Sequence, residues 1–143
     1  MNFFEAVKSA FSKYGTIAGR SLRSEYWYFA LFFIIGFYVS AIIDTQTAGV
    51  SLEDALLEEF LGPILTIFLL VMFIPQVTVT VRRFHDIGMS GWWALVAYCI
   101  SFISFDYPLA AIGMIPFFYL MCKKGDEYEN RFGPDPLASD KKQ

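Results

Sequence analysis

The residues best suited to chemistry lie in one short segment between two apolar stretches of the chain. It contains two adjacent arginines, the single histidine, an aspartate and two adjacent tryptophans: Arg82, Arg83, His85, Asp86, Trp92 and Trp93. Arginine forks match the oxygens of phosphate groups, so one interpretation is a site for a phosphate or an anionic lipid headgroup. The structural alternative is that the arginines end a helix, where cations complement the helix dipole, and that the tryptophans anchor the next helix at a membrane surface.

Catalysis by His85 and Asp86 is disfavoured by their spacing. Adjacent residues rarely share one face, and no positioned nucleophile accompanies them in the sequence. One histidine and two separated cysteines leave no spacing typical of metal ligands. We therefore predict a protein that is not an enzyme, with no metal and no cofactor, and no nucleic acid among its partners.

A second charged group, Arg20, Arg23 and Glu25, comes just before the first apolar run. The topology argued below puts it at the same membrane depth as the segment 82–93. We therefore expect one contiguous cluster on the cytoplasmic face, in which Asp86 pairs with Arg20 or Arg23 and the remaining arginines face lipid phosphates.

The composition indicates a membrane protein. Hydrophobic residues make up 56% of the 143 residues and charged residues only 17%, whereas soluble domains carry about a quarter charged residues. Four apolar segments are predicted to span the membrane as helices, at about 26–43, 61–81, 91–105 and 108–122. The first two match the ~30 Å of a bilayer core, and the last two are separated by a turn predicted at Asp106-Tyr107-Pro108.

The distribution of positive charge predicts the orientation. All 11 lysines and arginines fall before the first span, after the second or after the last. The charged residues of 44–60 are all acidic. Four spans place every positive charge inside, as the positive-inside rule expects, whereas a single kinked span over 91–122 would put five of them outside. We predict a multi-pass protein of the bacterial inner membrane with both termini in the cytoplasm.

Two further segments have the pattern of amphipathic helices, 3–14 and 51–61. The first is predicted to lie in the membrane interface and to stop near Gly15. The expected fold is all-α: a four-transmembrane-helix bundle with this N-terminal helix, in one membrane domain over 1–137 followed by a polar tail at 138–143. Cys99 and Cys122 are expected to be small core residues and not a disulfide.

Three motifs in order resemble one bacterial inner-membrane family. They are Gly19-Arg20-Ser21-Leu22-Arg23-Ser24-Glu25-Tyr26-Trp27-Tyr28-Phe29, the segment Arg82–Trp93, and Asn130-Arg131-Phe132-Gly133-Pro134-Asp135-Pro136. Together they are similar to the family known as domain of unknown function 805, the YhaH/YhaI-like proteins, over about residues 10–137. The resemblance implies a helical inner-membrane protein and brings no activity, substrate or catalytic residue. The long acidic segment 44–60 departs from it.

Two functions follow as hypotheses. The first is a non-catalytic module that binds anionic lipid headgroups or a membrane-protein partner at its cytoplasmic face. The alternative is a component of a small transporter or channel built by homo-oligomerisation, with Pro75, Gln76 and Pro116 lining a path.

Overall fold

The computed structural model contains five helices in the residues it describes, which are 1–49, 51, 61–106 and 112–138. The helices are α1 (Phe3–Ser12), α2 (Arg23–Ala48), α4 (Pro63–Asp86), α5 (Trp92–Asp106) and α6 (Met114–Cys122). These parts of the chain contain no strand, only an isolated bridge between Asn130 and Gly133. The expected all-helical class is confirmed.

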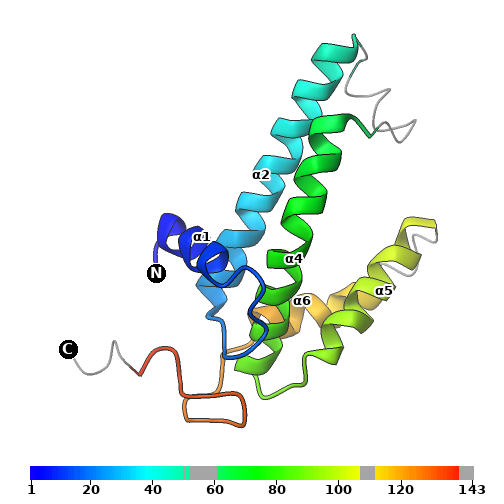
Figure 1. Ribbon diagram of the computed structural model, residues 1–143. Coiled ribbons are helices and arrows are strands. Elements are labelled where there is room, and N and C mark those ends of the chain that lie inside the picture. Colours follow the sequence, from blue (N-terminus) through cyan, green and yellow to red (C-terminus); the bar gives the residue numbers. More distant parts are fainter. Residues whose placement is uncertain (50, 52–60, 107–111, 139–143) are drawn as a thin grey trace.

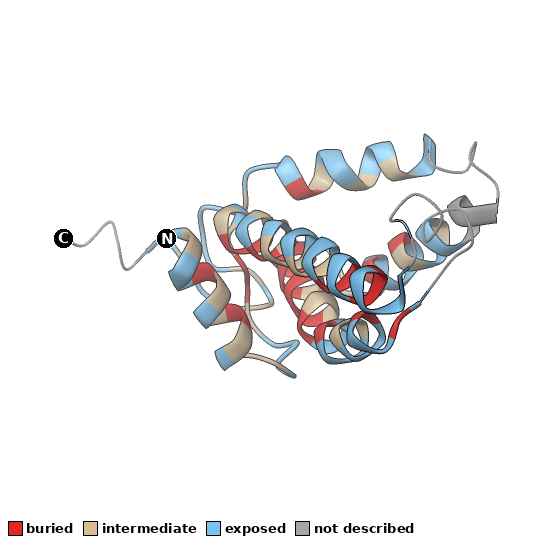
Figure 2. Ribbon diagram, turned by 90° about the horizontal axis from the view of Figure 1, so that it is seen from above, coloured by how far each residue is buried: buried red, intermediate tan, exposed pale blue. Residues whose placement is uncertain are grey.

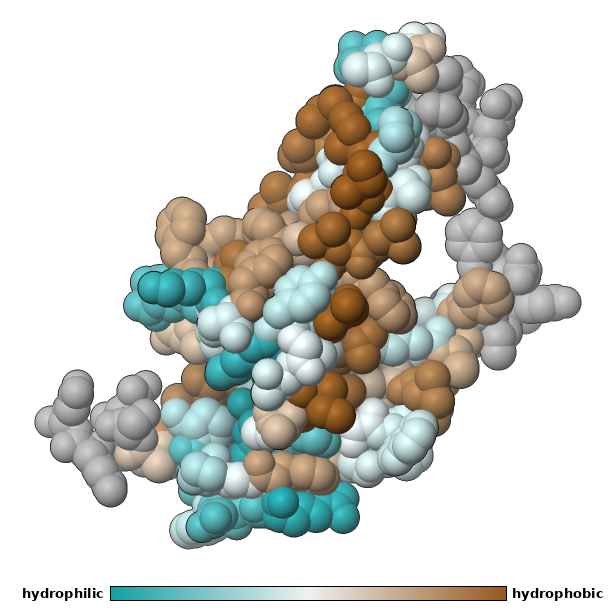
Figure 3. Space-filling model, in the orientation of Figure 1, coloured by the Kyte–Doolittle hydropathy of each residue, from teal (hydrophilic) through white to brown (hydrophobic). Residues whose placement is uncertain are grey.

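Helices α2 and α4 form a long antiparallel pair that dominates the molecule (Figure 1). Both are long and apolar enough to cross a membrane, and they are the only described helices of which this is true. At 1.5 Å per residue they measure roughly 39 and 36 Å, which exceeds the ~30 Å hydrocarbon core. Their buried faces meet each other, and much of the outward surface is exposed and apolar (Figures 2 and 3).

Helix α1 begins at a capping box and packs on α2. The Asn2 side chain accepts from the Glu5 amide at 2.9 Å, and Glu5 accepts from the Asn2 amide at 2.8 Å. Ala6 and Ala10 are fully buried against the bundle. The predicted helix over 3–14 is therefore present, but it ends at Ser12, two residues earlier than expected.

Helix α5 leads away from the lower end of the α2–α4 pair, and α6 runs back toward it (Figure 1). With 15 and 9 residues, they measure roughly 22 and 14 Å and fall short of a bilayer core. Residues 107–111 between them, which include Tyr107 and Pro108 of the expected turn, lie outside the described part. So do residues 52–60 of the second predicted amphipathic helix and the tail from 139. The four-helix transmembrane bundle is thus a prediction that this geometry does not confirm.

The described residues add to two expectations and correct a third. Beyond the expected second span of 61–81, α4 continues to Asp86 and carries the charged residues within its last turns. Helix α6 lies within the expected last span of 108–122, of which residues 108–111 are outside the described part. Cys99 and Cys122 are free thiols, as expected, but both are exposed, because α5 and α6 turn these positions outward from the bundle.

Candidate functional site

A charged cluster is buried at the end of the bundle where α2 begins and α4 ends. We call Arg20, Glu25, Arg82, Arg83 and Asp86 the arginine cluster. Glu25 comes from the first turn of α2, and Arg20 from the loop before it. The last two turns of α4 supply the other three residues. Both side chains of every ion pair in the cluster are 4% exposed or less.

The cluster consists of two ion-paired groups. Asp86 accepts from Arg20 Nε at 2.9 Å through one carboxylate oxygen and from Arg83 Nη1 through the other. Glu25 accepts from Arg82 Nη2 at 3.0 Å, and also from Ser9 of α1 at 3.1 Å. Three guanidinium groups thus face two carboxylates, and the remaining charge must be met by other acceptors.

Backbone carbonyls supply those acceptors. Arg82 donates to the Thr16 carbonyl at 2.8 Å, Arg20 to the Tyr128 carbonyl at 2.8 Å, and Arg83 to the Met121 carbonyl at 3.2 Å. The three carbonyls belong to segments that are not regular helix or that lie at a helix end. A buried charge is tolerated when it is paired and hydrogen-bonded in this way. The arginines therefore fasten the loops to the helix ends.

The expected pairing of Asp86 with Arg20 is confirmed, and the expected contact of the remaining arginines with lipid phosphates is wrong for two of them. Arg82 and Arg83 are fully buried and occupied by protein acceptors. Arg23, the other suggested partner of Asp86, points outward and donates to the Cys122 carbonyl at 3.3 Å.

The other predicted site residues lie at the edge of the cluster or away from it. His85 is buried, but its ring turns toward Phe132 and stacks on it with centroids 3.8 Å apart and planes 4° apart. Trp92 and Trp93 are exposed on α5, and Trp92 lines a separate groove between α4 and α5. The nine candidate residues are therefore near one another along one end of the fold, but only five form the buried cluster.

The C-terminal segment covers the cluster, which sequence reasoning missed. The Asn130 side chain donates to the His85 carbonyl and to Asp126 Oδ2, both at 2.9 Å, and the Asp126 amide donates to the Asp86 carbonyl at 2.8 Å. A Cβ on Gly125 would overlap the Asp86 carboxylate, so only glycine allows this approach. The available signal was the Asn130–Pro136 motif quoted for the resemblance.

A second missed residue is Asp44 at the opposite end of the α2–α4 pair. It was assigned to an outer acidic loop, but it lies within α2 and is only 2% exposed. Its carboxylate accepts from the amides of Ile64 at 3.2 Å and Leu65 at 2.7 Å, and so caps α4. The available signal was that α4 begins at Gly62-Pro63 without a capping side chain of its own.

A hollow of about 450 Å³ lies beside the cluster on the outer side of α2. We call it the Arg23 hollow; it is lined by Arg23, Ser24, Trp27, Tyr28 and Cys122. Among the described residues, Arg23 has no carboxylate partner, and its recorded hydrogen bond is the one to the Cys122 carbonyl. Its guanidinium therefore keeps most of its donors available to an anion.

In the described residues, no group of three or more histidine, cysteine, aspartate or glutamate side chains is placed to hold a metal ion. The carboxylates of the cluster are occupied by arginines, as described above.

Comparison with known proteins identifies the family. The model of a family described as a protein of unknown function (DUF805) matches residues 14–134. The chain belongs to the DUF805 family. It is 36% identical to the inner membrane protein YhaH of Escherichia coli K12 over 122 residues, which cover 82% of this chain and 84% of the relative.

A second relative from the same organism, the inner membrane protein YhaI, is 33% identical over 128 residues, which cover 90% of this chain and 92% of the relative. No solved structure matches this DUF805 chain. The region matched by the family model, residues 14–134, includes the whole arginine cluster and the residues Gly125, Asp126 and Asn130 that cover it. The resemblance expected from the three motifs is thereby confirmed, as is the relation to inner-membrane proteins.

Proposed function

We propose that this DUF805 protein is a non-catalytic membrane module that binds anionic lipid headgroups at the end of the fold where the arginine cluster lies. The observation that carries the proposal is the Arg23 hollow. The three cluster arginines are buried and paired with carboxylates of the protein. Arg23 is exposed and lies beside Ser24, Trp27 and Tyr28. The proposed phosphate therefore contacts Arg23.

The surroundings of Arg23 suit a membrane interface. Trp27 stacks on Phe118 of α6 with centroids 6.3 Å apart, and Tyr28 meets Phe3 of α1 edge to face at 6.1 Å. Tryptophan and tyrosine concentrate at headgroup depth, where their rings are apolar and their polar atoms remain hydrated. An arginine at that depth lies within reach of lipid phosphates and pairs with them through two parallel hydrogen bonds.

The proposed orientation places both termini and the arginine cluster in the cytoplasm, with α2 and α4 crossing the membrane. The charge distribution of the sequence and the length of these helices support it. Single cysteines at Thr47 and Ala138, in a background without Cys99 and Cys122, test the orientation with a thiol reagent that does not cross membranes. In intact spheroplasts Thr47→Cys should label and Ala138→Cys should not. The reverse pattern contradicts the orientation.

A cysteine at Asp106 tests the number of crossings. In a four-span bundle the end of α5 reaches the outer side, and Asp106→Cys labels like Thr47→Cys. If the α5–α6 pair turns back within the bilayer, Asp106→Cys is not labelled in spheroplasts.

Lipid binding is tested on the purified protein in nanodiscs that contain equal amounts of phosphatidylglycerol and phosphatidylcholine. Native mass spectrometry then measures which lipid is retained after gentle release. Each basic residue near an anionic surface contributes about 1 kcal/mol, so Arg23→Ala should lower the preference for phosphatidylglycerol about fivefold. Arg23→Lys keeps the charge but loses the planar pair of guanidinium donors, and should lower the preference for phosphatidylglycerol less than Arg23→Ala does.

Arg131→Ala is the matched control, because Arg131 is exposed, lies over Phe132, donates to the Gly88 carbonyl and is not part of the Arg23 hollow. It should leave the preference close to that of the unmodified protein. Equal loss in both alanine variants would mean that general surface charge, and not the Arg23 hollow, retains the lipid.

One observation favours the transporter alternative. The amide oxygen of Gln76, next to Pro75 in the middle of α4, is buried and has no hydrogen-bond partner among the described residues. A polar atom left unsatisfied inside a membrane bundle is what a ring-shaped oligomer would use to line a path. Mass measurement of the protein in nanodiscs separates the proposals, since a channel requires a closed oligomer and the lipid-binding module does not.

A further inference from the structure

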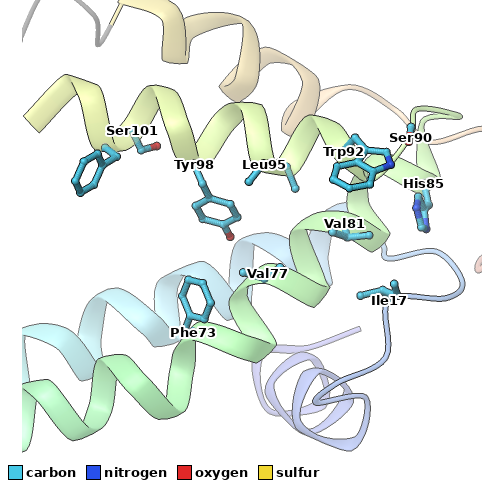
Figure 4. Close-up of a pocket in the computed structure, with 13 residues that line it drawn as sticks. Ile17, Phe73, Val77, Val81, His85, Ser90, Trp92, Leu95, Tyr98 and Ser101 are labelled. Atoms are coloured by element: carbon cyan, nitrogen blue, oxygen red, sulfur yellow. The ribbon is translucent and has the colours of Figure 1, made fainter.

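A groove lies between α4 and α5, separate from the Arg23 hollow. It encloses about 1050 Å³, at the upper end of the roughly 300–1000 Å³ common for small-molecule sites. We call it the α4–α5 groove. Its walls are apolar side chains of both helices, among them Phe73, Val77, Val81 and Leu95 (Figure 4).

The groove is open because α5 packs loosely on the bundle. Over residues 92–102 of α5, the buried hydrophobic residues are Ala94 and Ala97, which are small. Leu95 and Phe102 line the groove but remain 54% and 79% exposed. If α4 crosses the membrane as proposed, the α4–α5 groove opens laterally, in the plane of the bilayer, to the acyl chains.

One end of the groove is polar and uncharged. His85, Ser90 and Trp92 lie together there (Figure 4). His85 Nδ1 lies 3.1 Å from the Gly19 carbonyl oxygen, and because a carbonyl only accepts, Nδ1 carries the proton. In the neutral ring Nε2 is then an acceptor, and it has no recorded partner in the described residues.

The absence of charge distinguishes this groove from the Arg23 hollow. Its lining, within the described residues, contains no lysine, arginine, aspartate or glutamate. An anionic headgroup would find no cation there, whereas a hydroxyl group would find an acceptor at His85 and a second hydroxyl at Ser90. Tyr98 is already paired with Thr80 at 3.2 Å further along the groove.

We propose that the α4–α5 groove binds a diacylglycerol-type lipid, with an acyl chain along α4 and α5 and its free hydroxyl donating to His85 Nε2. The apolar walls, the lateral opening and the unpaired acceptor at one end each match a part of such a molecule. The binding is independent of Arg23.

The test uses Trp92 as a reporter in the variant Trp27→Phe/Trp93→Phe, which leaves it as the single tryptophan. Nanodiscs of ordinary phosphatidylcholine receive one of two lipids, a diacylglycerol or a phosphatidylcholine. Both added lipids carry brominated acyl chains, which quench nearby tryptophan. The brominated diacylglycerol should quench Trp92 at about a fifth of the mole fraction that brominated phosphatidylcholine needs, the effect of one hydrogen bond of roughly average strength.

Two variants locate the effect. His85→Gln removes the ring while keeping polar atoms, and should remove the difference between the two lipids. Leu95→Phe narrows the groove away from its polar end and should weaken quenching by the diacylglycerol. Ile34→Phe is the matched control, since it adds the same bulk at an exposed position of α2 outside the groove lining.

Three results would overturn the proposal. Equal quenching by both lipids would show that the groove does not select a hydroxyl. A preference that survives both His85→Gln and Leu95→Phe would place the lipid elsewhere. Loss of quenching as the protein forms dimers would show that a second copy covers the groove. Arg23→Ala should leave the quenching unchanged, so failure here is distinct from failure of the headgroup proposal.

Discussion

The arginine cluster and the α4–α5 groove lie at opposite faces of the same helix and are built in opposite ways. At the cluster, side chains from α2, α4 and the loop between α1 and α2 meet with almost no exposure, and the charged groups are paired within the protein. At the groove, Ala94 and Ala97 are the buried hydrophobic residues in the described part of α5, and large apolar side chains are left uncovered. The contrast indicates that the charged side chains of the cluster are committed to contacts within the fold, while the exposed apolar side chains of α5 remain available to lipids.

The largest predicted effect breaks the cluster at its centre. Asp86→Ala leaves the buried guanidinium groups of Arg20 and Arg83 without their carboxylate, and removing one partner of a buried pair costs about 3–5 kcal/mol. The free energy of unfolding in detergent micelles, from denaturant titration followed by circular dichroism, should fall by that amount. Glu129→Ala, at an exposed position of the covering segment, should change it by no more than ~0.5 kcal/mol. Equal losses in the two variants would contradict the structural role.

An intermediate effect is expected at the far end of the α2–α4 pair. Asp44→Ala removes the cap of α4 and should cost about 1–2 kcal/mol. Asp44→Asn keeps one acceptor oxygen and should cost less. Hydrogen exchange measured by mass spectrometry should quicken at the start of α4, including Ile64 and Leu65, with little change near Asp86. Uniform quickening over the whole helix would show that the cap is not local.

The smallest effect is expected on the groove side. Tyr98→Phe removes the hydroxyl that pairs with Thr80 and should cost no more than ~1 kcal/mol, the net value of one neutral hydrogen bond. The matched control is Tyr119→Phe on α6, where the residue is 69% exposed. A loss at Tyr98 as large as that for Asp86→Ala would mean that α5 is as firmly integrated as the cluster.

The sequence predicts the parts of this fold that depend on local pattern. The long charge-free runs predict α2 and α4, because a helix that faces lipid must be apolar over most of its length. The shared membrane depth of Arg20 and Asp86 predicts their pairing, because helix ends at one depth of a small bundle lie within reach of each other.

The parts that it does not predict depend on residues far apart in the chain. The charge-free run ends at 81, whereas α4 continues to Asp86, because Glu25 pairs with Arg82 and polar groups of residues 16 and 121–130 hydrogen-bond the last turns of the helix. From the sequence alone Asp44 is expected to be an exposed acid, because nothing in the local pattern shows that α2 places its carboxylate against the first amides of α4. Such contacts are set by tertiary geometry, which neither composition nor periodicity contains.

A charge-swap experiment tests most directly the central claim that the cluster arginines serve the fold and Arg23 serves a ligand. Asp86→Arg should strongly destabilise the protein in detergent. Adding Arg20→Asp should restore at least ~1 kcal/mol of the lost free energy, the coupling expected for residues in direct contact. Adding Arg23→Asp should restore none of it, because Arg23 is exposed and contacts the Cys122 carbonyl. Recovery with Arg23→Asp and not with Arg20→Asp would contradict the account.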